Sequence, residues 1–161
     1  MKKLRSGFSM LVAIFTIVVI SLVASYIFYA SASINKEGEI QYQKEQAMLL
    51  ARSYTEYAVM AVSANNRNIN CINNINATIG TNPAIGQGYK VEVKITYIGN
   101  QKYIYKCLRK AATLSNSDID TLSVIIDVYV RYRDRSNASL YNRYSSFVPW
   151  FTYHKRSLQK I

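Results

Sequence analysis

The chain opens with an apolar segment that is long enough to cross a membrane. No charged residue occurs from Ser6 to Asn35, and only serine and threonine hydroxyls interrupt the 23 apolar-rich residues from Phe8 to Ala30. A helix of that length rises about 35 Å at 1.5 Å per residue, whereas a bilayer's hydrocarbon core is about 30 Å thick. The pattern therefore predicts a membrane-spanning helix over residues 8–32.

The helical period continues beyond this segment, over residues 33–63. Small and apolar residues recur there at spacings of three and four, while Lys44, Arg52 and Glu56 occupy the other face. The predicted buried stripe consists of Ala47, Leu50, Ala51, Tyr54, Ala58, Ala61 and Val62. We expect one continuous helix, with its first half in the membrane and its amphipathic second half packed on a sheet.

Residues 64–161 show the two-residue alternation of strands. Residues 65–88 are rich in Asn, contain Pro83 and show no period, so we expect an irregular loop there. Tyr89 to Ile98 and Leu122 to Tyr132 alternate cleanly, and a turn at Gly99-Asn100 would join the first of these strands to a hairpin partner at residues 103–108. The expected fold class is α+β, with one long helix packed on a small antiparallel sheet.

The charges that flank the apolar segment predict how it lies in a membrane. Lys2, Lys3 and Arg5 precede it without any acidic residue, so the N-terminus is expected in the cytoplasm and the remainder on the far side of a bacterial inner membrane. A secretory signal peptide is one alternative, because Ala30-Ser31-Ala32 fits a signal peptidase site. Signal peptides, however, have apolar regions of only about 7–15 residues. A plain single-pass anchor is the other alternative.

The residues where the basic N-terminus meets the apolar segment resemble a known processing signal. Lys2-Lys3-Leu4-Arg5-Ser6-Gly7-Phe8-Ser9-Met10-Leu11 resembles the N-terminal signal of type IV prepilins and of type II secretion pseudopilins. In that family a basic leader ends in Gly, a prepilin peptidase cuts after it, and the new N-terminal Phe is methylated. The resemblance implies that residues 1–7 are a cytoplasmic leader, that Gly7 and Phe8 are the processing site, and that the fold is pilin-like, with residues 64–161 as a periplasmic domain.

One position departs from the family pattern. The fifth mature residue is usually Glu, but counting from Phe8 places Val12 there, and the first acidic residue of the chain is Glu37. In the family this carboxylate is thought to neutralise a neighbour's N-terminal amine, and an unpaired charge in hydrocarbon is costly. The resemblance therefore implies a minor subunit that primes or caps a filament of a secretion, pilus or DNA-uptake machine, with other pilins or pseudopilins as partners.

The chain contains two cysteines, Cys71 and Cys107, and both follow the apolar segment. An exported domain experiences an oxidising environment, so we predict one disulfide between them, with two buried free thiols as the alternative. The loop between them is long enough that closing it would stabilise the fold by about 3–4 kcal/mol.

Catalytic and metal chemistry find little support in the sequence. The single histidine, His154, lies near the basic C-terminus, where we expect an exposed tail residue without a catalytic partner. Two cysteines and one histidine do not form a zinc set, and Asp118 and Asp120 are a weak match to calcium ligands because no further acids lie at ligand spacing. We therefore expect no enzyme activity, no cofactor and no metal.

The excess of positive charge is concentrated toward the C-terminus. The chain carries a net charge of +11, and residues 129–161 contain seven Lys and Arg against one acid, interleaved with eight aromatic residues. Basic side chains neutralise phosphates and aromatic rings stack on bases, which favours DNA contact as in a competence-type pilin. A solvated basic face over an aromatic core is the alternative interpretation. The candidate DNA contacts are Arg131, Arg133, Arg135, Arg143, Lys155 and Arg156.

Overall fold

The computed structural model describes residues 4–66, 69–114, 122–134 and 149–161. Its first element is helix α1 (Leu4–Ala64), which is followed by strand β1 (Asn74–Asn82), a 3₁₀ turn (Pro83–Ile85) and strand β2 (Gln87–Asn100). A short helix α2 (Gln101–Ile104) precedes strands β3 (Lys110–Leu114), β4 (Ser123–Tyr132) and β5 (Phe151–Lys160). The chain divides into two compact units, residues 1–39 and residues 40–161, and each is described separately below.

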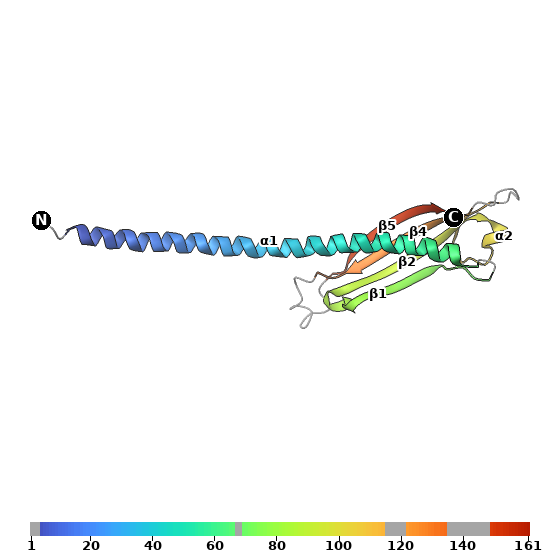
Figure 1. Cartoon of the computed structure of the whole chain (residues 1–161), viewed down its shortest axis with the longest axis horizontal. Coiled ribbons are helices and arrows are strands. Elements are labelled where there is room, and N and C mark those ends of the chain that lie inside the picture. The colour runs from blue at the N-terminus through green and yellow to red at the C-terminus, as the bar shows by residue number, and fades with distance from the viewer. Residues whose placement is uncertain (1–3, 67–68, 115–121, 135–148) are drawn as a thin grey trace. The chain divides into compact units, whose positions relative to one another are not determined.

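The second unit is built on a five-stranded sheet in which four strands form an antiparallel ladder. The order is β1-β2-β4-β5 (Figure 1), so β1 and β5 are its outer members. β3 pairs with the end of β2 in parallel. The central register places Val91 opposite Val130 and Val93 opposite Val128. Since residues two apart share a face, the apolar residues of β2 and β4 lie on one side of the sheet.

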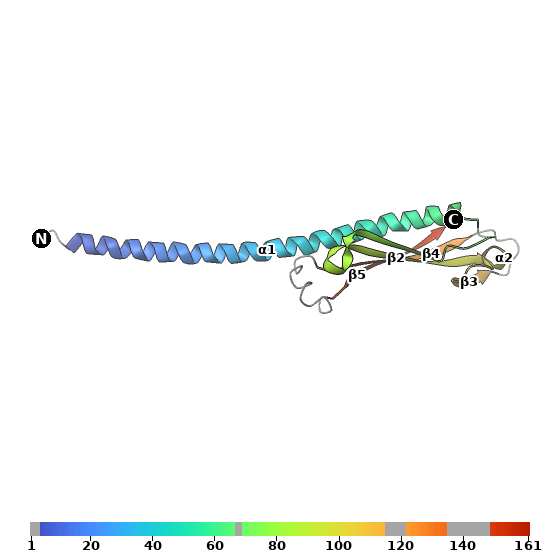
Figure 2. The same ribbon diagram turned by 90° about the horizontal axis from the view of Figure 1, so that it is seen from below.

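That apolar side of the sheet is covered by the α1 residues that belong to the second unit (Figure 2). Ala47, Ala51 and Ala58 are completely buried against the strands, as is Val62. Alanine leaves room for the helix backbone to approach the sheet closely, because it carries only a methyl group. Tyr89 of β2 adds a polar link, since its hydroxyl donates to the Gln43 carbonyl at 3.3 Å.

Several sequence predictions are confirmed by these elements. The helix over residues 33–63 is present and buries its predicted stripe, although Leu50, Tyr54 and Ala61 are only half-buried. The strands predicted at 89–98 and 122–132 are β2 and β4, with the expected inward residues. The α+β arrangement of one long helix packed on a small, mainly antiparallel sheet is therefore observed.

The irregular loop predicted over residues 65–88 is wrong, because β1 occupies much of it. Its weak apolar alternation (Ile75, Ala77 and Ile79) is enough to face the core once β2 supplies the backbone hydrogen bonds. Gly80 and Gly88 stand opposite each other at positive φ, and a Cβ on either would meet the facing backbone at 2.1–2.8 Å. The two glycines therefore permit a close strand approach that larger residues would prevent.

The hairpin predicted around Gly99-Asn100 is also wrong. These two residues continue β2, and the Asn100 side chain caps the short helix α2 by accepting from the Lys102 amide at 3.0 Å. As a result, Cys107 lies in the connection after α2 and not on a strand. The chain then returns as β3, which runs parallel to β2.

The last strand, β5, was missed by the sequence analysis. Its residues include Thr152, His154, Arg156 and Lys160 on one face and Tyr153, Lys155 and Ser157 on the other, so it lacks the usual apolar alternation. It pairs with β4 along its whole length, from Tyr132 opposite Phe151 to Ser123 opposite Lys160. His154 is exposed, as predicted, but it lies in β5 and not in a tail.

Candidate assembly helix and basic sheet face

The first unit contains the residues of the prepilin-like motif. The backbone of Gly7 and Phe8 is helical, as α1 begins at Leu4. From Met10 onward the apolar side chains are exposed, among them Val12 at 44%, Phe15 at 67% and Phe28 at 78%. Within the described residues, α1 is the one helix long and apolar enough to cross a membrane. An apolar helix with uncovered side chains needs lipid or other apolar helices around it.

The second unit carries a further exposed apolar stripe, on the face of α1 that points away from the sheet. Tyr42, Leu49, Tyr57 and Met60 are 52–63% exposed. Their spacings of seven, eight and three residues place them along one side of the helix, opposite the buried alanines. Tyr57 also packs edge-to-face on the half-buried Tyr54, with ring centroids 6.1 Å apart. We call Tyr42, Leu49, Tyr57 and Met60 the outer stripe.

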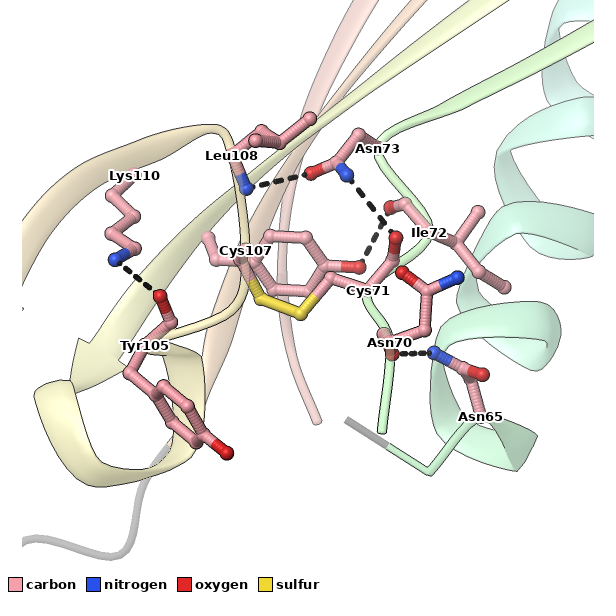
Figure 3. The surroundings of a disulfide bond; sticks show 10 residues. Asn65, Asn70, Cys71, Ile72, Asn73, Tyr105, Cys107, Leu108 and Lys110 are labelled. Atoms are coloured by element: carbon pink, nitrogen blue, oxygen red, sulfur yellow. Dashed lines mark hydrogen bonds between the residues drawn. A yellow bond between two sulfur atoms is a disulfide. The ribbon is translucent and has the colours of Figure 1, made fainter. Parts of the chain in front are cut away.

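The predicted disulfide between Cys71 and Cys107 is confirmed (Figure 3). Both cysteines are almost fully buried. Asn73 joins the two segments that the disulfide links, because its side chain donates to the Cys71 carbonyl at 3.1 Å and accepts from the Leu108 amide at 3.2 Å. The Asn73 carbonyl accepts from the Ile95 amide at 2.9 Å. The disulfide thus fastens the segment before β1 to the connection after α2.

The face of the sheet opposite α1 is polar and mainly basic. At its centre, Arg156 of β5 holds Asp127 of β4 through two hydrogen bonds, Nε to Oδ1 at 2.7 Å and Nη2 to Oδ2 at 3.0 Å. His154 Nε2 lies 2.7 Å from the same Oδ1, and its ring stacks on Tyr129 at 4.4 Å between centroids. The hydrogen bond from Arg156, followed by that from His154, holds the pKa of the Asp127 carboxyl below its usual value despite burial, which opposes this shift.

A second cluster lies on the same face, on β2 and β4. Glu92 pairs with Lys94 at 3.2 Å and with Arg131, and these two cations, Lys94 first, lower its pKa. Lys94 also lies over the Tyr129 ring at 5.1 Å. Beside this cluster is an open pocket of about 510 Å³ lined by Asn76, Ala77, Thr78, Lys90, Val91, Glu92 and Arg131.

The structure separates the basic residues that the sequence grouped together. Arg131 and Arg156 share the polar face, and each is paired with a carboxylate. Arg133 donates to the Ala84 carbonyl at 3.0 Å and lies 4.9 Å from the Trp150 ring. Lys155 is half-buried and points to the other side of β5. Arg135 and Arg143 lie outside the described residues.

The remaining sequence candidates add no chemistry to this surface. Among the residues that the structure describes, no three His, Cys, Asp or Glu side chains come together to hold a metal ion. Asp118 and Asp120 fall outside the described ranges. The partnership of His154 with Asp127 could not have been read from spacing, because 27 residues separate them and β5 lacked a strand signature.

Comparisons with protein-family models, with curated proteins and with solved structures find no match to this chain.

Proposed function

We propose that this chain is a minor structural subunit of a type IV pilus-like filament. The main support is that α1 combines two features. It contains the Gly7-Phe8 junction, and its apolar residues from Met10 onward are exposed. Cleavage after Gly7 would remove only the basic leader and leave the membrane helix attached to the folded domain. A secretory signal, in contrast, would separate the two.

The outer stripe supports this proposal independently of the motif. A helix that only anchors a domain needs no apolar side chains on its solvent face beyond the membrane segment. Leu49 and Met60 nevertheless expose 60% and 63% of their surface there. Neighbouring subunits that pack helix against helix would cover both the membrane segment and this stripe.

Val12 supports a minor role within such a filament. Without a carboxylate at this position, the processed amine of a neighbour lacks a partner in hydrocarbon, and the described part of α1 has no acid before Glu37 to replace it. A subunit at the tip, which primes or caps the filament, requires one such pairing fewer than a subunit in its middle.

The test is the intact mass of the full chain purified from membranes that contain a prepilin peptidase. We expect loss of seven residues and gain of one methyl group on Phe8, because the leader comprises residues 1–7. The variant Gly7→Leu should retain its leader, whereas Ser6→Ala, one residue away, should still be cut. Unprocessed wild-type protein, or a new N-terminus at Ser33, would contradict the proposal.

A further inference from the structure

We infer that the free edge of β5 is a docking site for an extended acidic segment of another protein, which would add a strand to the sheet. β5 is an outer member of the sheet, and no other described strand pairs with its far edge (Figure 1). This inference goes beyond the filament proposal and holds whether or not the chain enters a filament.

The register identifies which backbone groups are available. The Ile161 amide donates to the Leu122 carbonyl at 2.8 Å, so this pair is of the hydrogen-bonded kind. Antiparallel pairs alternate, so the odd-numbered residues of β5 direct their N–H and C=O groups to β4. The even-numbered residues direct theirs to the free edge. These are Thr152, His154, Arg156, Leu158 and Lys160.

The side chains of this edge indicate what kind of strand it accepts. β5 contains Lys155, Arg156 and Lys160 and no acidic residue. Arg156 is paired with Asp127 of β4, but its side chain remains 65% exposed. If a second copy added its own β5 with Leu158 opposite Leu158, Arg156 would stand opposite Lys160, and like charges in opposite positions are destabilising. Such charges are a common protection of sheet edges against self-association. They select against this chain's own edge and favour an acidic partner.

Leu158 makes the selection more specific. Its side chain is 66% exposed between Arg156 and Lys160, on the same face of the sheet. A partner strand that matches these three positions has the pattern acid, any residue, apolar residue, any residue, acid. Because this pattern is symmetric about Leu158, a strand in either direction meets the same three side chains. Backbone hydrogen bonds would supply affinity and the alternate side chains specificity, as in other strand-addition complexes.

The experiment uses the full chain in lipid nanodiscs and a ten-residue peptide with a Glu-Thr-Val-Thr-Glu centre. We expect saturable binding by fluorescence anisotropy and about tenfold weaker binding of the Lys-Thr-Val-Thr-Lys peptide. N-methylation of the alternate amides that face β5 should abolish binding. N-methylation of the other amides should be tolerated.

Protein variants test the same edge. Leu158→Pro removes an N–H that β4 does not use, so it should abolish peptide binding with little change in thermal stability. Leu158→Ala keeps the N–H and should weaken binding without abolishing it. If Leu158→Pro impairs folding, Lys160→Glu provides a second variant. At the peptide position that faces residue 160, this variant should prefer Lys over Glu. The peptide series on the wild-type chain is independent of any variant.

Three results would overturn the inference. One is the absence of binding at about 1 mM peptide, because a dissociation constant above that concentration is too weak for a useful interaction. Another is equal loss on N-methylation of either set of amides. The third is displacement of the peptide by a single-stranded oligonucleotide of equal charge, which would show that the basic side chains bind polyanions without strand addition.

Discussion

Asp127 and Arg156 stand directly opposite each other on β4 and β5, joined by two hydrogen bonds on the polar face of the sheet. The Asp127 side chain is 9% exposed, whereas that of Arg156 is 65% exposed. The pair therefore anchors an edge strand with few apolar contacts through a carboxylate that water scarcely reaches.

This relationship predicts loss of stability in acid. The folded-state pKa of Asp127 lies below its unfolded value, so its contribution is present above about pH 4 and disappears as pH falls through the lower folded value. Asp127→Asn should lower the free energy of unfolding at neutral pH by about 1–2 kcal/mol and flatten this acid decline. Thermal unfolding of the full chain in detergent between pH 7 and pH 2 measures both effects.

Glu92→Gln is the matched control for Asp127→Asn. In the wild type, the pKa of the Glu92 carboxyl is lowered as that of Asp127 is. The Glu92 side chain is 29% exposed, however, so water screens its ion pairs more strongly. We expect a smaller loss of stability than for Asp127→Asn. An Asp127→Asn variant with the wild-type acid profile would show that the pair with Arg156 contributes nothing to the pH dependence.

Reduction of the disulfide should destabilise the second unit. The bond closes a loop over a separation of 36 residues, which in the chain-entropy model corresponds to about 3–4 kcal/mol. We expect dithiothreitol to lower the melting temperature of the wild type and to leave a Cys71→Ser, Cys107→Ser double variant unchanged. An equal shift in both proteins would mean that the reagent acts elsewhere.

The buried alanines predict sensitivity to larger side chains. Ala58 is fully buried between α1 and the sheet, so Ala58→Leu should separate the helix from the strands and cost about 1–3 kcal/mol. Met60→Leu, two residues away and 63% exposed in the wild type, should be nearly neutral. Chemical unfolding followed by circular dichroism distinguishes the two, and a neutral Ala58→Leu would contradict close helix-sheet packing.

The outer stripe predicts a change in assembly without a change in folding. Leu49→Lys and Tyr57→Lys place charges on an exposed surface, so the melting temperature should move little. If neighbouring helices cover the stripe, both variants should fail to enter filaments in a sedimentation assay. Arg52→Glu, on a different side of α1, is the control. Normal incorporation of both stripe variants would exclude this surface from the filament interface.

The sequence predicted those parts of the molecule that local chemistry specifies. The apolar run after Phe8 requires a helix long enough for a membrane, and the stripe through Ala47, Ala51 and Ala58 specifies which side of that helix is buried. β2 and β4 were equally clear because both have one apolar face. The disulfide could be predicted because the chain has two cysteines and both lie in a domain that is expected to be exported to an oxidising environment.

Tertiary structure decided what local patterns could not. β1 has weak alternation and β5 has none, so both depend on hydrogen bonds offered by β2 and β4, and their partners are distant in the chain. The basic residues that lie close in sequence were divided between the two sides of β5 by its two-residue period. The pairing of Asp127 with Arg156 and His154 exists only because β5 aligns with β4 in one register, which brings together charges that no spacing along the chain connects.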